Sequence, residues 1–416
     1  MRLTEEERLL AQGDGGEAVG MAMRIVTETA KLLGANELVP IASAHIDGCL
    51  YHGDGGVLFA EKLVDGKAKV RVPTTLNVGA MDLLKPERIK GTAHQREMAV
   101  RQMKSYEQMG CRPTWTCAPY QAGHRPELGQ HVAWGESNAV AFCNSVLGAR
   151  TNRYGDFLDI CCAITGRAPL SGLHLDRNRR ATVLIDISSI SERLRRHDVF
   201  YPVLGSWLGR ETGNAVAVID GVPNTVTEDQ LKALGAAAAS TGAVGLFHVA
   251  GVTPEAATVE DALHHEEPES TIVLTTEAVL QTRDGLSTVG EERVDVVVLG
   301  SPHFSIQEFD QLEQALAGAK TEIPIHVCTG RGVLQRLEQE GRADLLREAG
   351  VEIIVDTCVV VAPILKTPGG VLMTNSGKFA HYGPGTIGYD VVYGSLEDCV
   401  MTAKTGKVTR ERTLWS

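Results

Sequence analysis

The segment HIDGCLYHGD concentrates side chains that can bind a metal ion or move a proton. It contains His45, Asp47, Cys49 and His52. On an extended segment, the alternating positions 45, 47 and 49 point to one face and bring an imidazole, a carboxylate and a thiol together. A zinc hydrolase could use this set, although structural zinc sites have more closely paired ligands. The alternative is a polar strand edge that ends in the glycine-rich turn GDGG.

Cysteines in three other places could also carry chemistry. Cys117 lies in RPTWTCAPYQAGH, which crowds polar and aromatic groups around one thiol. Cys111 precedes it by six positions, a spacing that is wrong for a zinc knuckle or a redox CxxC pair. Cys358 follows the apolar run VEIIVDT. Each thiol could be a small buried hydrophobe, or it could join distant cysteines as a ligand of a metal cluster.

The segment WGESNAVAFCNSVLGARTNR indicates an anion site at the start of a helix. Ser137 and Asn138 begin this helix, and the N–H groups and dipole of a first turn suit a carboxylate or phosphate. Arg150 and Arg153 supply forked donors for a planar carboxylate. The alternative is a capped helix with surface arginines.

The segment TNSGKFAHYGPG (374–385) is a glycine-bounded polar stretch that we interpret as a loop around Lys378. Its composition resembles an anion-binding loop, but it lacks the spacing G-x-x-x-x-G-K-[ST], which argues against nucleotide binding. Three other cysteines are expected to pack in the interior, namely Cys143, Cys161 and Cys162. Cys399 is expected either in the interior or at the surface.

The C-terminal half predicts the elements that would position these residues. Continuous β-branched runs alternate with helical segments, which is typical of parallel sheets covered on both faces. Ligands of such sheets bind at the carboxyl ends of the strands, near a switch in strand order. Ser301, His303, Cys328 and Cys358 are expected at that edge. The predicted strands lie in 214–224, 243–251, 271–276, 294–300, 323–328 and 351–358, and the predicted helices in 228–239, 306–317 and 332–349.

The N-terminal half is less regular. A short helix over 4–10 has a capping box, formed by Thr4 and Glu7. A second helix over 16–33 should close at Gly34. The region 41–77 reads as β-structure. Further helices are expected over 95–109, from residue 137, and in the apolar run DFLDICCAITG.

Composition narrows the class of protein. The chain has 416 residues, enough for two or three lobes, with 43% hydrophobic and 22% charged residues. A net charge of −12 without a basic run argues against nucleic-acid binding. No stretch approaches the ~20 apolar residues of a membrane span. Nine cysteines without a secretion signal indicate reduced thiols in the cytoplasm.

Taken in order, these segments resemble the large subunit of the aconitase X family, within the aconitase superfamily. The resemblance runs through HIDGCLYHGDGG, PTTLN, WTCAPY, NSVLGARTNR, GVTPEA, SPHFS, DTCVVVAP and TNSGKFAHYGPG. It implies an α/β protein with several α/β/α lobes around a central cleft. We expect N-terminal lobes over 1–210, an α/β lobe over 211–290 and a C-terminal α/β lobe over 291–416.

The resemblance also implies an iron–sulfur cluster, [2Fe–2S] or [4Fe–4S], or a single iron. Cys117 and Cys358 are the implied ligands. The branch of the family that dehydrates phosphorylated mevalonate usually has a cysteine before Pro-His, where this chain has Ser301. Cys49 is our expected third ligand, with Ser301 or Cys111 as alternatives.

The implied reaction is dehydration of cis-3-hydroxy-L-proline to Δ1-pyrroline-2-carboxylate. His45, Asp47 and His303 are the catalytic candidates. A small swivel-domain subunit should supply an essential serine base, which predicts a heterodimer. The alternatives are dehydration of mevalonate 5-phosphate or another hydroxy acid, and a metal-free binding or regulatory homologue. The candidates for holding the substrate are Ser137, Asn138, Asn144, Arg150 and Lys378.

Overall fold

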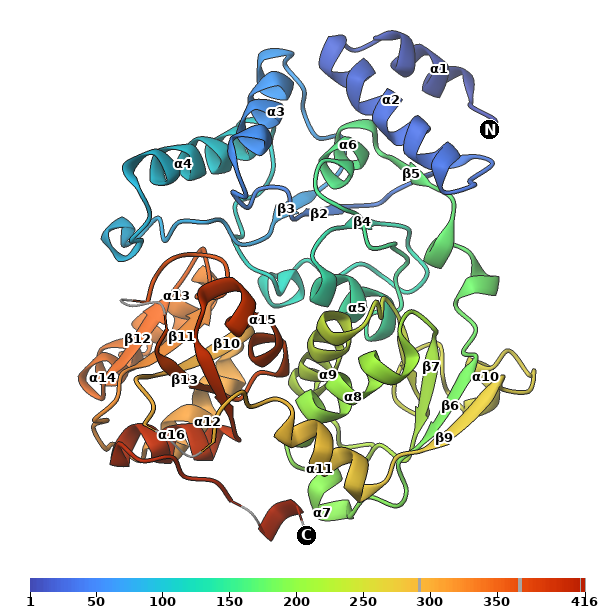
Figure 1. The fold of residues 1–416 in the computed structure, drawn as a ribbon. Helices are drawn as coiled ribbons and strands as arrows, with labels where there is room; N and C mark the ends of the chain where they lie inside the picture. Colours follow the sequence, from blue (N-terminus) through green and yellow to red (C-terminus); the bar gives the residue numbers. More distant parts are fainter. Residues whose placement is uncertain (291–292, 366–368, 412, 416) are drawn as a thin grey trace. The chain divides into compact units, whose positions relative to one another are not determined.

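The computed structural model describes residues 1–290, 293–365, 369–411 and 413–415 (Figure 1). The chain divides into two compact units. Unit 1 comprises Met1–Met81 and Gly91–Arg180, and unit 2 comprises Asp82–Lys90 and Ala181–Ser416. Each is described below by itself.

Unit 1 begins with the two predicted helices. Thr4 caps α1, and the capping box with Glu7 is present. The chain leaves α2 through Gly34, which has the left-handed φ of 68° that the sequence predicted there. The main helices of the unit are α1 (Glu5–Gln12), α2 (Glu17–Leu32), α3 (Asp54–Asp65), α4 (Ala93–Gln108), α5 (Ser137–Ser145) and α6 (Leu158–Thr165).

The expectation of continuous β-structure over 41–77 was wrong, because α3 interrupts it. Val57, Ala60 and Leu63 are buried at a spacing of three residues. That spacing follows one face of a helix and not the alternation of a strand. Of the glycines that suggested a turn, Gly53 is the N-cap residue of the helix, and Gly55 and Gly56 lie in its first turn.

Unit 1 contains a small parallel sheet and an antiparallel pair. The parallel sheet has the order β3-β2-β4, formed by Thr74–Leu76, Ala44–Ile46 and Ala133–Trp134. The pair consists of β1 (Leu38–Pro40) and β5 (Arg167–Pro169). The parallel sheet is the framework for the candidate residues of this unit.

The first sheet of unit 2 is parallel, with the order β8-β7-β6-β9. Its strands are β6 (Val183–Asp186), β7 (Ala217–Asp220), β8 (Phe247–Val249) and β9 (Ser270–Val273). The helices of this part are α7 (Glu192–Arg195), α8 (Phe200–Thr212), α9 (Glu228–Thr241), α10 (Val259–Ala262) and α11 (Thr276–Asp284).

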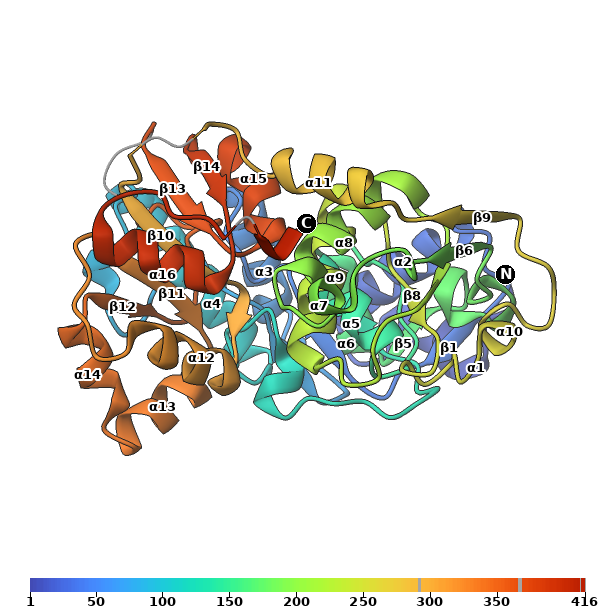
Figure 2. The ribbon, with the colours of Figure 1, turned by 90° about the horizontal axis from the view of Figure 1, so that it is seen from below.

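The second sheet of unit 2 is also parallel, with the order β12-β11-β10-β13-β14. Figure 2 shows α14 beside β12 and α16 beside β10. The prediction of parallel, doubly wound α/β structure is therefore confirmed. The strands are β10 (Val296–Phe304), β11 (Ile325–Thr329), β12 (Val351–Ile354), β13 (Val371–Thr374) and β14 (Asp390–Tyr393). The helices are α12 (Ile306–Leu316), α13 (Arg331–Gln339), α14 (Arg342–Glu348), α15 (Gly377–Ile387) and α16 (Leu396–Thr405).

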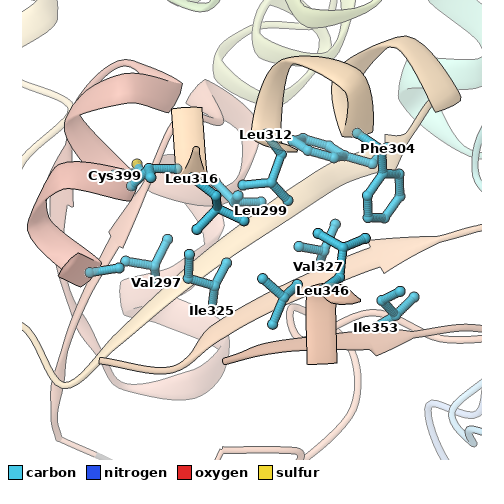
Figure 3. Packing of buried hydrophobic residues seen from close by; sticks show 14 of the residues in the cluster. Val297, Leu299, Phe304, Leu312, Leu316, Ile325, Val327, Leu346, Ile353 and Cys399 are labelled. Atoms are coloured by element: carbon cyan, nitrogen blue, oxygen red, sulfur yellow. The ribbon is translucent and has the colours of Figure 1, made fainter. Parts of the chain in front are cut away.

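Buried hydrophobic side chains of this second sheet pack against those of its helices and form one core (Figure 3). All residues of β10 are buried, as expected for a strand covered on both faces. The Cys399 thiol lies among the aliphatic side chains of this core, which shows that Cys399 is structural and not at the surface.

The predicted helix over 332–349 is in fact two helices. α13 ends at Gln339 and α14 begins at Arg342. Gly341, between them, has a left-handed φ of 71° that breaks the helical path. The apolar periodicity continues across the break, so periodicity alone does not reveal it.

Candidate active site

Polar side chains follow β2 and β3 of the parallel sheet in unit 1 at its carboxyl edge, and a glycine follows β4. Asp47 follows β2, Asn77 follows β3 and Gly135 follows β4. The Asn77 side-chain amide donates to a carboxylate oxygen of Asp47. Carboxyl ends of parallel strands are where α/β proteins bind ligands, so this edge is a candidate site.

The predicted shared face of residues 45, 47 and 49 is not formed, because the strand ends too early. β2 stops at Ile46, and the Leu50 N–H donates to the Asp47 carbonyl at 3.1 Å to close a turn. The carboxylate of Asp159 holds this turn by accepting from the Asp47 N–H at 2.7 Å and the Gly48 N–H at 3.2 Å.

Asp47 is placed to carry a proton. Burial, followed by the nearby carboxylates of Glu136 and Asp156, raises the pKa of Asp47 to about 8. The Asn77 amide opposes this shift by donating to the charged form. Asp47 is therefore largely protonated at neutral pH and can donate as well as accept.

Cys49 is enclosed by backbone. Its thiol has no exposed surface, and its sulfur lies 3.3 Å from the carbonyl oxygen of Ile46 and 3.4 Å from that of Asn77, either of which can accept its single hydrogen. Burial, followed by the Asp47 and Asp159 carboxylates, raises the pKa of Cys49 well above its ordinary value. These surroundings favour the thiol over the thiolate that binds metals.

The loop that carries Cys117 runs beside β3. The Arg112 N–H donates to the Thr74 carbonyl at 2.8 Å, and the Thr116 N–H donates to the Leu76 carbonyl at 3.2 Å. The Asn138 side-chain amide then donates to the carbonyl of Cys117 at 2.9 Å. Cys117 is thereby held next to the end of β3, at the edge that carries Asp47.

The predicted helix at Ser137 and Asn138 is present as α5, but its first turn is capped by its own chain. Glu136 is the N-cap residue, with a φ of 63°, and its carboxylate accepts from the Ala139 N–H at 2.9 Å. One of the N–H groups expected to receive an anion is therefore already used by a carboxylate. Ser137, the first helical residue, is half-buried.

Asn144 lies at the other end of α5, away from Ser137 and Asn138. Its amide oxygen accepts from the Thr151 N–H at 3.0 Å and from Arg179 at 3.2 Å. Its amide nitrogen donates to the Thr151 carbonyl at 2.9 Å. This bonding fastens the end of the helix to the chain that follows it.

Arg150 is also engaged within unit 1. Its guanidinium forms an ion pair with Asp176 and donates to the His174 carbonyl at 3.4 Å. Its Nε atom is buried and has no hydrogen-bond partner among the described residues. Arg153 is exposed. The two arginines of this segment thus have different surroundings.

His45 belongs to a hydrogen-bonded chain that the sequence did not reveal. Its Nδ1 lies 2.9 Å from the hydroxyl of Thr75, which lies 2.7 Å from Nδ1 of His124. His124 Nε2 lies 2.8 Å from the hydroxyl of Ser43. Thr75 is the cross-strand partner of His45, and only knowledge of the β2–β3 register could have identified it.

In unit 2, the strand order places the switch point between β10 and β13. The SPHFS and TNSGK segments lie at the ends of these two strands. The Ser376 hydroxyl donates to the carbonyl of Ser301, which joins the segments across the switch point. Gly300 has a φ of 86°, and a side chain there would overlap the Cys328 backbone.

The segment 374–385 is largely helical, which corrects our expectation of a loop. Ser376 caps α15 and accepts from the Phe379 N–H at 3.0 Å. Lys378, in the first turn, is half-buried and close enough to His303 to lower its pKa. The cation is therefore positioned by a helix start and not by a flexible loop.

His303 is fully buried, and burial lowers its pKa to about 4, so it is neutral at physiological pH. Its Nε2 lies 3.3 Å from the carbonyl oxygen of Thr357. A carbonyl can only accept, so Nε2 carries the proton and Nδ1 carries the lone pair.

Cys358 follows β12 in a loop, as predicted. Asp356, two residues earlier, has a left-handed φ of 65°. Its carboxylate accepts from Arg331 at 2.5 and 2.7 Å and from the Leu83 N–H at 3.1 Å. Trp115, two residues before Cys117, likewise has a positive φ of 45°. Both candidate ligands thus follow a residue in a conformation that must be held by its surroundings.

The structure does not by itself assemble a metal centre. In the part of the chain that it describes, no group of three or more His, Cys, Asp or Glu side chains is arranged to hold a metal ion. Several buried polar atoms nevertheless lack hydrogen-bond partners among the described residues, among them His45 Nε2 in unit 1 and Thr357 Oγ1, next to Cys358, in unit 2. Unmet groups of this kind are compatible with a bound group or substrate.

Comparison with known families assigns the chain. Residues 1–177 match the aconitase X first domain, residues 181–284 the second domain and residues 294–405 the third domain. The chain belongs to the aconitase X family. It is therefore a dehydratase of the aconitase X type, as the resemblance implied.

Individual relatives agree with this assignment. The aconitase X chain is 41% identical to a cis-3-hydroxy-L-proline dehydratase of Pseudomonas aeruginosa, over 100% of this chain and 72% of the relative. It is 38% identical to a phosphomevalonate dehydratase large subunit of Methanothermobacter thermautotrophicus, over 94% of this chain and 96% of the relative. The holo-form crystal structure of Thermococcus kodakaraensis aconitase X matches with a TM-score of 0.87 and 33% identity, over 97% of this chain and 100% of that chain. None of the described helices is long and apolar enough to cross a membrane.

Proposed function

We propose that this aconitase X chain is the large subunit of an enzyme that dehydrates cis-3-hydroxy-L-proline to Δ1-pyrroline-2-carboxylate. Two relatives named for that activity are 41% and 40% identical to this chain, whereas the phosphomevalonate dehydratase large subunit of M. thermautotrophicus is 38% identical. The observation that carries the choice is Ser301. It stands at the switch point of unit 2, where the phosphomevalonate branch usually has a cysteine.

We propose that Cys117 and Cys358 hold an iron–sulfur cluster. Each thiol lies in a loop fixed by buried polar contacts, and a related structure is described as a holo-form. When bound, such a cluster supplies an open iron position that acts as a Lewis acid on the leaving hydroxyl. For the third ligand we keep Cys49, with Ser301 and Cys111 as alternatives, because a thiol gives up its proton to a metal more readily than a serine hydroxyl does.

The residues of this chain would bind the substrate and move protons. Lys378 is a half-buried cation beside neutral His303, and it can hold the carboxylate of an imino acid. His303 Nδ1 can accept a proton. Asp47 carries a proton at neutral pH and can deliver it to the leaving hydroxyl.

We further propose that a small swivel subunit completes the enzyme. The large subunit from M. thermautotrophicus is matched over 96% of its length, and its name implies a smaller partner. The P. aeruginosa relative is matched over only 72%, so part of it has no counterpart in these 416 residues. The partner would supply the equivalent of that part, including the serine base.

The test is to co-express the chain with a candidate small subunit, reconstitute it anaerobically, and assay cis-3-hydroxy-L-proline and mevalonate 5-phosphate in parallel. Turnover of the first and not the second is expected. The reverse preference would overturn the substrate assignment, and full activity of the chain alone would overturn the two-subunit arrangement.

Iron and sulfide analysis tests the cluster separately from the substrate. Cys117→Ser, Cys358→Ser and Cys49→Ser should each lose iron. Retention of iron in Cys49→Ser would instead favour Ser301 or Cys111 as the third ligand. A wild-type protein that lacks iron after anaerobic reconstitution would indicate a metal-free homologue, and bound zinc would indicate a hydrolase.

A further inference from the structure

A short segment from the N-terminal half of the sequence belongs to unit 2. The chain leaves unit 1 after Met81, contributes Asp82–Lys90 to unit 2 and returns to unit 1 at Gly91. We call Asp82–Lys90 the strap. Within unit 2, the strap bonds to the loop that carries Cys358, on both sides of the thiol, although the two segments are far apart in the sequence.

Asp82 gives the strap a fixed shape. Its carboxylate has no exposed surface and accepts from the Leu84 N–H at 3.0 Å and the Lys85 N–H at 2.8 Å. It also accepts from Nη1 of Arg88 at 2.9 Å. These donors compensate the buried charge of the carboxylate. The position of the Arg88 guanidinium is therefore set by the strap itself.

The strap bonds the chain at two points before Cys358. Nη1 of Arg88 donates to the carbonyl of Ile353 in β12 at 2.6 Å. The Leu83 N–H donates to the carboxylate of Asp356 at 3.1 Å, across 273 positions of sequence. The Arg88 bond has a charged donor, which makes it one of the stronger kinds of hydrogen bond. The backbone is thus held where it leaves β12.

The strap bonds the chain again after Cys358. The Lys90 N–H donates to the Pro363 carbonyl at 2.8 Å, and the Lys90 ammonium donates to the Ile364 carbonyl at 2.6 Å. The bonded positions therefore lie on both sides of the thiol, and one short segment of nine residues, Asp82–Lys90, provides all of these donors.

The loop between these positions closes its own turn. The N–H groups of Val361 and Ala362 donate to the carbonyl of Cys358 at 3.2 and 3.1 Å. These bonds shape the turn but do not connect it to the strands of unit 2. Holding both ends of a short loop restricts the backbone between them, because fewer conformations remain open to it.

We propose that the strap holds the Cys358 thiol in place before a metal binds, with Arg88 as the main positioning residue. The benefit to an iron–sulfur cluster rests on the proposed function, whereas the restraint on the loop does not. A ligand that is already held in place loses less conformational freedom on binding, so the strap raises the affinity of this chain for the metal.

Alkylation of the metal-free full chain by N-ethylmaleimide, followed by mass spectrometry of its peptides, measures the restraint. Cys358 is 8% exposed and reacts when its loop opens, whereas Cys399, in the core of the same unit at 0% exposure, needs unfolding of that core. In the wild type, Cys358 should therefore react faster. Arg88→Met should raise the Cys358 rate about tenfold, the worth of the lost hydrogen bond. Arg88→Lys, which keeps a cationic donor, should restore most of the protection.

Arg342→Met is the matched control in unit 2. The Arg342 side chain is 18% exposed, against 14% for Arg88, and it pairs with carboxylates of α12. Its loss should destabilise the fold and raise the Cys399 rate, but it should leave the Cys358 rate unchanged, because the Arg342 pairs persist when only the loop opens.

Two results would overturn the restraint: an unchanged Cys358 rate in Arg88→Met, or an equal rise of that rate in Arg342→Met. Lys90→Met serves if Arg88→Met does not fold, because the Lys90 side chain is exposed. It should raise the Cys358 rate about threefold, since it removes one weaker bond, and an unchanged rate there would also overturn the restraint.

The role toward the metal has its own measurement. After anaerobic reconstitution of the full chain, Arg88→Met should release iron to a chelator about tenfold faster than Arg342→Met. Equal release rates would show that the restraint does not serve the metal. A wild-type chain that takes up no iron would overturn the proposed cluster, while the alkylation rates would still decide whether the strap holds the loop.

Discussion

Asn138 donates its side-chain amide to the backbone carbonyl of Cys117 at 2.9 Å, and this bond ties the start of α5 to the loop that carries the thiol. Both residues are nearly inaccessible to solvent, with exposures of 2% and 5%. A sequence position interpreted as a substrate contact thus has a second task, to hold a proposed cluster ligand in place.

Asn138→Ala should therefore lower iron retention as well as stability. Removing the donor takes one buried hydrogen bond from the Cys117 carbonyl, at a cost of about 0.5–1.5 kcal/mol in the free energy of unfolding. Asn144→Ala is the matched control on the same helix, because it breaks buried hydrogen bonds to Thr151 and Arg179 at the other end of α5. We expect both to lose stability in urea unfolding and only Asn138→Ala to lose iron per folded molecule. Equal iron contents would contradict the positioning role.

Asp356 should respond differently to asparagine and to alanine. Asparagine tolerates the left-handed backbone at this position and keeps an acceptor for the Leu83 N–H. Alanine has neither property and should destabilise the protein by about 1–3 kcal/mol. Urea unfolding of Asp356→Asn and Asp356→Ala measures the difference. Equal losses for the two variants would mean that the Arg331 ion pair is the dominant contribution.

Lys232→Met should be among the most damaging single substitutions in unit 2. The Lys232 ammonium is 3% exposed, pairs with Glu308 and with Asp229 at 2.8 Å, and donates to the His303 carbonyl at 3.3 Å. Removing it leaves the half-buried carboxylates of Asp229 and Glu308 without this cation, which costs up to about 3–5 kcal/mol.

The control for Lys232→Met is Lys31→Met, which breaks the exposed ion pair with Glu28. It should lower the free energy of unfolding by less than about 1 kcal/mol. The double variant Lys232→Met/Glu308→Gln should recover part of the loss, because it removes one unpaired charge. If thermal unfolding shows no recovery, the damage comes from packing and not from charge.

His174 should make the protein less stable in acid. It is 1% exposed, and its Nε2 lies 2.6 Å from the Tyr154 hydroxyl. Burial, followed by the neighbouring His131, lowers the pKa of His174 from 6.5 to about 3. Between these values the unfolded chain binds more protons than the folded one, so stability falls as pH falls from 6.5 toward 3. The slope from one such group is at most about 1.4 kcal/mol per pH unit.

Urea unfolding at a series of pH values measures this slope. His174→Gln should show a shallower decline than the wild type. His265→Gln, at a position where the side chain is 77% exposed, is the matched control and should leave the slope unchanged. Parallel declines for the wild type and His174→Gln would contradict the assignment.

Local sequence patterns predicted much of the fold. The capping box joins Thr4 and Glu7, which are three positions apart, and the apolar run that predicts β10 lies within a single strand. Both signals depend only on near neighbours, so the sequence alone determined these elements and the parallel α/β class. The same local signals failed where two patterns compete, as in α3, or where a single glycine turns the backbone, as at Gly341.

The candidate residues were found by type, but their tasks were decided by tertiary structure. Ser301 and Ser376 lie 75 residues apart in the sequence and meet only because β10 and β13 are neighbours in the sheet. His45 reaches Thr75 only through the register of β2 and β3. The chemical identity of a side chain is local, whereas its partner, its burial and thus its proton depend on which strands pair. The sequence alone determined which groups are available, and the pairing of distant strands decided what each of them can do.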